Sequence, residues 1–412
     1  MLAAVLLVAV PLFAQGKRLW VLRPPGELVE YDPTTFAAKQ TIKVPAESLQ
    51  SPQNLFVNRL GQVLFSPAVS LPLADTDVAS PPKAWLWDGH TASTLDLGLS
   101  RSVATTGSNQ EVTESAAIPY LSSDGAHLFW FGNQAHRLTR DEIDLSTITT
   151  WQAWRTDLTG ANREDTATAK FPDCRCATGS CEETCPYGVI SAPDSGIDNF
   201  FLMTQFVAGN VGAVYKESSR CQQQAGKWSC TSMADPVHRV LDTTSDGSVF
   251  VEAIPDTGCC GWANQSDDLT LVRDGTKRTV FDELAVYKNP DYDVSFYTEN
   301  ARLSPSLRSV AMTITATSAA NQPIQLSKDG QANPEESLAI RKALAELPLV
   351  EVKSLEDSRS LARIPHATLI GWLTEDEILI LEGHLLTTYN LSTKARRKST
   401  VRVADAAHLF LR

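Results

Sequence analysis

The chain has 412 residues, a formal net charge of −12 and a sequence pI near 5.1, and 43% of its residues are hydrophobic. This acidic balance opposes a general affinity for phosphate backbones or anionic lipids, so nucleic acid is not an expected partner. The length is sufficient for one large core or for two domains.

The sequence begins with an unbroken apolar run over residues 2–14, followed by small and polar residues. This pattern is typical of a signal peptide, and the run is shorter than the roughly 20 apolar residues that span a bilayer. A buried first strand is the alternative. We therefore predict a signal peptide over residues 1–14, a single domain over residues 15–412, a secreted or periplasmic location and no membrane span.

A weak unit then recurs along the chain, in which a tight polar turn leads into a strand-like apolar run. The seven turns are centred at Gly16, Gly61, Gly125, Gly196, Gly247, Ser306 and Glu375. The runs that follow them are "RLWVLR", "QVLFSP", "HLFWFG", "DNFFLM", "SVFVEA", "SVAMTI" and "EILILE". β-Branched and aromatic residues favour strands, and Gly suits the positive φ of a tight turn. The units therefore predict seven blades of antiparallel strands.

One of these hairpins, "LSPSLRSVAM" at residues 303–312, is similar to the Ser-Pro-Asp-Gly hairpin that opens the blades of TolB-like and WD40-like propellers. The turns are spaced more widely than the roughly 40 to 50 residues of familiar propeller repeats, so we expect inserted loops. The chain thus resembles secreted bacterial β-propeller proteins. The resemblance implies an all-β fold, here a seven-bladed β-propeller.

The ends of the chain predict how the ring closes. The first unit begins with its second strand, and "AHLFLR" at residues 407–412 is a surplus strand that can supply the missing inner one. Pairing of the two ends leaves no large open sheet edge. One inserted helix is expected over residues 333–347, with Asn333 as N-cap and Pro334 in the first position, packed against the sixth blade.

Sorting the inserted loops by their place in a blade puts most of them on one face of the propeller. They are residues 66–83 of blade 2, 132–149 of blade 3, 254–267 of blade 5 and the long crossovers between blades. Binding usually resides in loops on a rigid scaffold, so this loop-rich face is the expected working face.

Eight cysteines fall into three groups. Cys174, Cys176, Cys181 and Cys185 lie in the crossover from blade 3 to blade 4, Cys259 and Cys260 lie in the blade 5 loop, and Cys221 and Cys230 flank a hairpin-like segment. An even count in an exported protein favours disulfides, with Cys221 paired to Cys230 and a bridge from the crossover to the blade 5 loop. A structural metal or a redox centre is the alternative, although the spacing departs from zinc and ferredoxin patterns.

No local catalytic motif is present, so an active site would need polar residues gathered around the central funnel. The expected funnel residues are Asn54, Glu114, Tyr187, Arg239 and Arg302 for ligand binding, with His238, Glu299 and His366 as an alternative catalytic set. Each of them can also be an ordinary polar residue at a strand end.

No cofactor or metal is expected, and calcium at Asp291, Asp293 and Glu299 is the alternative because hard carboxylates suit this cation. The sequence favours an exported, non-catalytic platform that binds a protein or a glycan through its loop-rich face. A propeller enzyme, a lyase or hydrolase with dispersed funnel residues, is the alternative.

Overall fold

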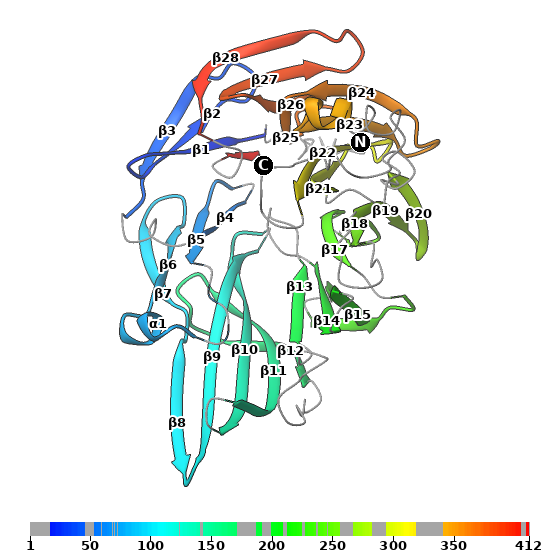
Figure 1. The fold of residues 1–412 in the computed structure, drawn as a ribbon. Helices are drawn as coiled ribbons and strands as arrows, with labels where there is room; N and C mark the ends of the chain where they lie inside the picture. Colours follow the sequence, from blue (N-terminus) through cyan, green and yellow to red (C-terminus); the bar gives the residue numbers. More distant parts are fainter. Residues whose placement is uncertain are drawn as a thin grey trace, which may run out of the picture.

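In the computed structural model the chain is an all-β β-propeller, whose sheets follow one another around a ring (Figure 1). The structure describes residues 17–45, 53–58, 60–67, 69, 71, 73–122, 124–140, 143–170, 187–191, 199–208, 212–224, 227–235, 238–244, 246–255, 267–281, 294–318, 341–404 and 409–411. Within these ranges no helix is both long and apolar enough to span a bilayer.

The described strands form seven antiparallel sheets, six with four strands and one with five. The first three four-stranded sheets, in hydrogen-bonding order, are β29 (Leu409–Leu411), β1 (Leu19–Arg23), β2 (Glu27–Tyr31) and β3 (Ala38–Lys43); β4 (Gln53–Val57), β5 (Val63–Pro67), β6 (Lys83–Trp87) and β7 (Ala92–Asp96); and β13 (Tyr187–Ser191), β14 (Asn199–Ala208), β15 (Gly212–Gln224) and β16 (Lys227–Ser232).

The remaining four-stranded sheets are β17 (Arg239–Thr243), β18 (Val249–Pro255), β19 (Asp267–Arg273) and β20 (Thr276–Phe281); β21 (Val294–Leu303), β22 (Ser309–Ser318), β23 (Leu349–Ser354) and β24 (Ser360–Pro365); and β25 (Ala367–Trp372), β26 (Glu377–Glu382), β27 (Leu385–Asn390) and β28 (Arg396–Arg402). The five-stranded sheet consists of β8 (Ser100–Thr106), β9 (Asn109–Leu121), β10 (His127–Arg140), β11 (Ile143–Asp157) and β12 (Glu164–Lys170). The sequence predicts seven units of one kind. Counted along the chain, the sheet of β8–β12 is the third, and it differs from the other six because it has five strands.

Hydrophobic side chains fill the spaces between consecutive sheets. Five buried clusters are found among the described residues, and each is contributed by two neighbouring sheets. In β1, Leu19 and Val21 pack with the sheet of β25–β28, whereas Trp20 between them packs with the sheet of β4–β7. Successive side chains of a strand point to opposite faces, so a strand between two sheets must be apolar on both. This explains the continuous apolar runs in the sequence.

The two ends of the chain meet in one sheet, as the sequence predicts. β29 pairs antiparallel with β1, with Leu19 opposite Leu411 and Val21 opposite Leu409. Leu409 and Leu411 are both buried in the cluster between the last sheet and the first. Because β29 adds the inner strand of the first sheet, residues at opposite ends of the sequence share one hydrogen-bonded ladder (Figure 1).

Short polar side chains fix the turns between the third and fourth strands of several sheets. In the first sheet, Asp32 Oδ1 accepts hydrogen bonds from the backbone N–H groups of Thr34 at 2.9 Å and Thr35 at 2.8 Å. Asp88, in the corresponding turn of the second sheet, accepts the same pair of bonds. The hydrogen bonds to Thr35 and the nearby Lys39 ammonium outweigh desolvation and lower the pKa of Asp32 to about 2. Such turns are local chemistry that a sequence specifies directly.

Two short helices decorate the sheets. Residues 341–346 are helical, and Ala343 is buried against Ile314 and Leu349 of the sixth sheet. The predicted helix is therefore confirmed over these residues, and its first part lies outside the described ranges. A second helix, α1 (Asp75–Ala79), lies in the connection between β5 and β6, where the sequence predicts only a loop.

Candidate functional site

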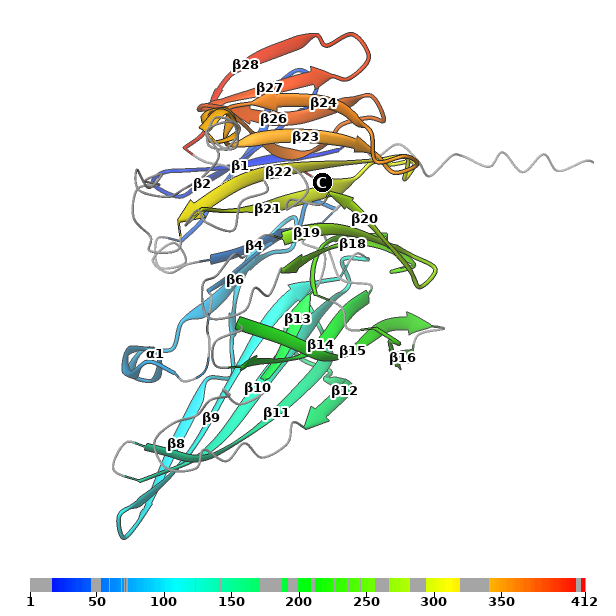
Figure 2. The ribbon, with the colours of Figure 1, turned by 45° about the vertical axis from the view of Figure 1, so that its right-hand side comes forward.

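The five-stranded sheet carries a projection that reaches beyond the other sheets (Figure 2). β9 is paired with β10 along its whole length, from Asn109 to Leu121, and its first half is also paired with β8. The expectation of a loop over residues 132–149 is wrong, because β10 continues to Arg140 and β11 begins at Ile143. We name the part formed by residues 100–115 and 134–150 the projection.

A buried ion cluster stabilises the base of the projection. Glu114 has a fully buried side chain, and its two oxygens lie 3.3 Å from Arg101 Nε and 2.7 Å from Arg137 Nη2. Arg101 Nη1 also lies 2.6 Å from Asp75 Oδ1 at the start of α1. Removing one member of such a cluster leaves buried charge without compensation, so these groups hold the strands in one arrangement. Glu114 is thus placed in the projection, with two arginines of its own sheet.

A groove runs along one side of this sheet, beside the segment that follows β7. Its volume is about 420 Å³. Its lining includes Ser115, Gln134, Thr150, Gln152, Trp154 and Arg163. The volume lies within the range of small-molecule sites, which combine apolar walls with a few polar groups. The groove extends from the β11–β12 turn to the base of the projection.

Two tryptophans form the apolar wall of the groove. Trp130 and Trp154 are direct cross-strand partners in β10 and β11, and their rings are parallel within 2° with centroids 6.1 Å apart. The Arg163 guanidinium lies 4.2 Å from the centroid of the Trp154 ring. Gly132 makes room for this ring, because an added Cβ would lie 2.6 Å from a ring carbon of Trp154. Trp130 is fixed in turn by a 2.8 Å hydrogen bond from its Nε1 to Thr156 Oγ1.

Polar side chains from neighbouring strands complete the groove. Ser115, Gln134 and Thr150 are aligned across β9, β10 and β11, so their side chains point to the same face as the two tryptophans. Gln134 and Gln152 are exposed, and Gln152 Oε1 accepts a 3.2 Å hydrogen bond from Arg163 Nη2. Amide and hydroxyl groups that both donate and accept hydrogen bonds therefore lie beside an aromatic wall.

Sequence reasoning missed this groove. Neither Trp130 nor Trp154 is among the predicted site residues, although both occur in runs rich in aromatic residues. Pairing of β10 with β11 places the two tryptophans on one face. This register could not be predicted because the strand segments of the projection were expected to be a loop. The two tryptophans were the feature of the sequence that could have indicated the groove.

Two of the predicted funnel residues connect neighbouring sheets. Arg239 Nη2 donates a 2.6 Å hydrogen bond to the carbonyl of Thr298, and Arg302 Nη1 donates a 2.7 Å bond to the carbonyl of Leu241. The indole of Trp372 donates in turn to the carbonyl of Arg302. These contacts cross the boundaries between the fifth, sixth and seventh sheets. In the structure, Arg239 and Arg302 therefore hold the first strands of adjacent sheets together.

His238 belongs to a separate buried cluster. Its backbone N–H donates a 2.7 Å hydrogen bond to Glu252 Oε2, and its Nδ1 lies 3.6 Å from the same oxygen. Lys277 Nζ lies 3.0 Å from the other oxygen. Desolvation acts to raise the pKa of Glu252, but the contacts with His238 and Lys277 outweigh it and the pKa is lowered. Glu252 is therefore held as a carboxylate.

The other members of the alternative catalytic set lie elsewhere. Glu299 is an exposed residue at an irregularity in the pairing of β21 with β22. His366 is exposed, precedes β25, and has its Nδ1 3.4 Å from the carbonyl of Leu347. The contacts of the two histidines connect His238 to Glu252 and His366 to Leu347.

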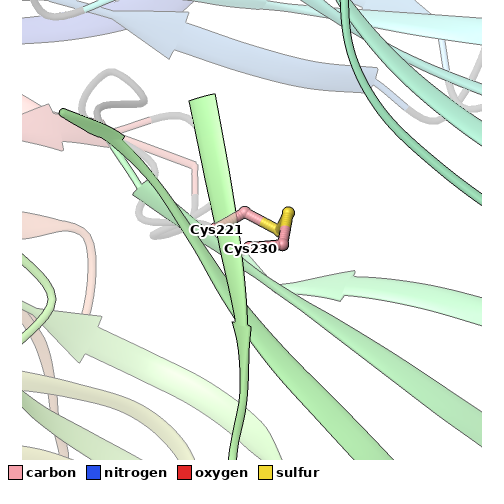
Figure 3. The surroundings of a disulfide bond; sticks show 2 residues. All are labelled: Cys221 and Cys230. Atoms are coloured by element: carbon pink, nitrogen blue, oxygen red, sulfur yellow. A yellow bond between two sulfur atoms is a disulfide. The ribbon is translucent and has the colours of Figure 1, made fainter. Parts of the chain in front are cut away.

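The disulfide prediction is confirmed for one pair. Cys221 and Cys230 are directly opposite each other in β15 and β16 and form a disulfide (Figure 3). The remaining cysteines and two of the three calcium candidates lie outside the described residues, as does the predicted signal peptide. They are Cys174, Cys176, Cys181, Cys185, Cys259 and Cys260, together with Asp291 and Asp293.

Two ligand-binding candidates are placed by their backbones. Asn54 lies in β4 opposite Ser66, and Tyr187 begins β13 opposite Gln205. The structure does not describe their side chains. Both positions belong to the first strand of a sheet.

Comparison with known proteins finds similarity in the fold. No protein family matches the sequence, and no curated protein is similar to it. Acylaminoacyl peptidase from Pyrococcus horikoshii aligns with 91% of this chain and 48% of its own at 12% identity and a TM-score of 0.43. The chain therefore spans about half the length of that peptidase.

Two further structures align over most of both chains. TolB from Acinetobacter baumannii aligns with 95% of this chain and 81% of its own at 12% identity and a TM-score of 0.33. The β-propeller domain of the trilobed protease from Pyrococcus furiosus aligns with 92% and 87% at 11% identity and a TM-score of 0.39. At these values the chain resembles TolB and a protease propeller domain in fold alone.

Proposed function

We propose that this chain is an exported, non-catalytic β-propeller that binds a glycan, with the groove beside Trp154 as its binding site. The observation that carries this proposal is the half-buried ring of Trp154, which lies parallel to the buried Trp130, next to the exposed amides of Gln134 and Gln152. The apolar C–H face of a sugar ring suits an aromatic wall, and its hydroxyl groups suit side chains that both donate and accept hydrogen bonds. The wider proposal is that the chain binds a protein or a glycan through its loop-rich face.

A rigid scaffold supports this role. We infer that the seven sheets form seven blades of one closed ring, with the five-stranded sheet as the third blade. Binding groups on packed strands are held more precisely than groups on free loops. Gly132 and Thr156 fix the two tryptophan rings before any ligand arrives, which lowers the entropy lost on binding.

Export is supported by two independent features. Residues 2–14 form an apolar run typical of a signal peptide, and Cys221 and Cys230 form a disulfide, a bond that persists mainly in oxidising compartments. The mature protein is expected to begin close to Gln15. Mass spectrometry of material from outside the cytoplasm tests this, and an intact Met1 there contradicts it.

The binding proposal is tested by calorimetric titration of a panel of neutral oligosaccharides into the purified protein. Gln152→Ala, at an exposed position, is expected to weaken binding about tenfold, because a lost hydrogen bond in a polar site costs roughly 1 to 2 kcal/mol. Ser360→Ala, at an exposed position of the sixth sheet, is the control and should leave binding unchanged. Failure of every oligosaccharide to bind, or binding that Gln152→Ala does not affect, refutes the proposal.

The same titration mixtures distinguish binding from catalysis. Mass spectrometry of the oligosaccharides after incubation should find them intact. Cleaved products that disappear in a His238→Ala variant would favour the enzyme alternative with its dispersed residues. Products that persist in this variant would show that cleavage does not depend on His238.

A further inference from the structure

The outermost strand of the projection, β8, presents an open edge. β8 has seven residues, and among the described strands it pairs with β9 alone, from Ser100 opposite Ser115 to Thr106 opposite Asn109. The pairing has no irregularity along its length. Six of the seven residues are exposed. Such an edge offers unpaired backbone N–H and C=O groups to another strand.

Four other outer strands of the propeller are protected against this kind of pairing. Natural edge strands carry lysine, arginine or proline, or irregular pairing that twists the edge away. Two or more lysine, arginine or proline residues occur in each of β3, β20, β24 and β28. Each of these strands also shows a shift in register with its neighbour. In contrast, β7, with the sequence "ASTLD", has neither these residues nor a shift in register, and it has only five residues. β8, with the sequence "SRSVATT", has only Arg101, whose charge contacts Glu114 and Asp75 within its own chain.

We propose that β8 pairs with β8 of a second copy of this chain, antiparallel about a two-fold axis at Val103. The strand is complementary to itself, as an interface on a two-fold axis requires. In this register Val103 faces Val103, Ser102 faces Ala104, Arg101 faces Thr105 and Ser100 faces Thr106. No two like charges are directly opposite in this register, so no pair of facing side chains repels across the axis.

The side chains of β8 favour this partner over a foreign peptide. Val103 is 52% exposed, the largest value among the exposed large hydrophobic residues of the described chain, and it lies at the centre of the strand. Pairing on the axis covers it with its own copy. Recognition of a foreign strand usually depends on pockets for alternate side chains. The small residues Ser102 and Ala104 face each other across the axis and need no such pockets.

The experiment measures the mass of the purified full chain by light scattering and sedimentation over a range of concentrations. The wild type should approach twice its 44.9 kDa. Val103→Lys puts two ammonium groups opposite each other and should raise the dimer dissociation constant about tenfold or more. Leu361→Lys, at an exposed leucine of β24, is the matched control and should leave the dimer intact. Circular dichroism and the unfolding midpoint of each variant check that it folds.

A cysteine scan tests the register independently. Cβ atoms of directly opposite residues lie about 4.5 to 5.5 Å apart, within reach of a disulfide after a small adjustment. Val103→Cys should give a covalent dimer on mild oxidation, whereas Thr105→Cys, which faces Arg101 of the other copy, should not. A wild type that stays monomeric, a dimer that Val103→Lys leaves intact, or equal cross-linking of both cysteine variants overturns the proposal. Binding of an extended peptide to β8 of a monomer would also overturn it.

Discussion

Truncating one leucine of the closing strand should destabilise the whole propeller. Leu411 in β29 is 7% exposed and packs in the cluster between the last and first sheets. Replacing it with alanine removes buried methyl groups and leaves a cavity, a change that costs about 2 to 5 kcal/mol in packed cores. The same change at Leu409, which is 6% exposed, should cost a similar amount. Either loss is a large fraction of the roughly 5 to 15 kcal/mol that stabilises a folded domain.

The effect is measured by thermal and urea unfolding followed by circular dichroism. For a chain of 412 residues the unfolding entropy converts this loss into a decrease of roughly 2 to 6 °C in the thermal midpoint. The control is Leu361→Ala in β24, where the side chain is 37% exposed and truncation should change stability by less than about 0.5 kcal/mol. An unchanged midpoint in the double variant Leu409→Ala/Leu411→Ala would refute the closing role of β29.

A double-mutant cycle tests whether β29 packs against β25 as the structure has it. An added Cβ at Gly371 in β25 would lie 3.2 Å from Leu411 Cδ2, so Gly371→Ala should crowd Leu411 and destabilise the protein. In the Leu411→Ala background this crowding disappears, and the two changes should together cost less than their sum. Strictly additive costs would show that the two side chains do not meet.

Three further predictions concern the groove, the turns and the disulfide. Gly132→Ala should displace the Trp154 ring, cost about 1 to 3 kcal/mol and weaken the near-ultraviolet circular dichroism of the tryptophans; an unchanged spectrum would contradict the close approach. The pKa of Asp32 is about 2 when folded, below its ordinary 3.8, so its contribution to stability is complete above about pH 4 and is lost as the pH falls towards 2. Asp32→Asn should therefore lower the unfolding midpoint at pH 6 but not at pH 2. Replacing both Cys221 and Cys230 with serine should lower the free energy of unfolding in urea by about 2 to 3 kcal/mol, and an unchanged value would contradict a stabilising role for this bond.

Much of the ring could be predicted because its elements depend on local chemistry. Alternating side chains of a strand between two sheets are all buried, so each strand appears as a continuous apolar run. The turns at Gly125 and Gly247 adopt the positive φ that glycine permits, and both lie where the sequence places them. The pairing of Cys221 with Cys230 followed from their positions on either side of a hairpin.

The projection could not be predicted in the same way. Its strands are partly exposed on both faces, so "SRSVATT" has no apolar period that distinguishes a strand from a loop. The Gly107 turn, with a φ of 64°, was the local signal for a hairpin there. Glu114 was expected at the funnel, whereas two arginines from neighbouring strands surround it in the projection.

Amino-acid order alone is enough to predict the strand runs, the polar turns and the closing strand, because each depends on residues adjacent in the chain or near one of its ends. Tertiary structure decided which side chains meet. The contacts of Arg239 and Arg302 with carbonyls of neighbouring sheets, and the alignment of Trp130 with Trp154, depend on register and on the order of sheets around the ring. A shift of one residue in strand register would turn a side chain to the opposite face, so a site built across several strands exists only once their pairing is fixed.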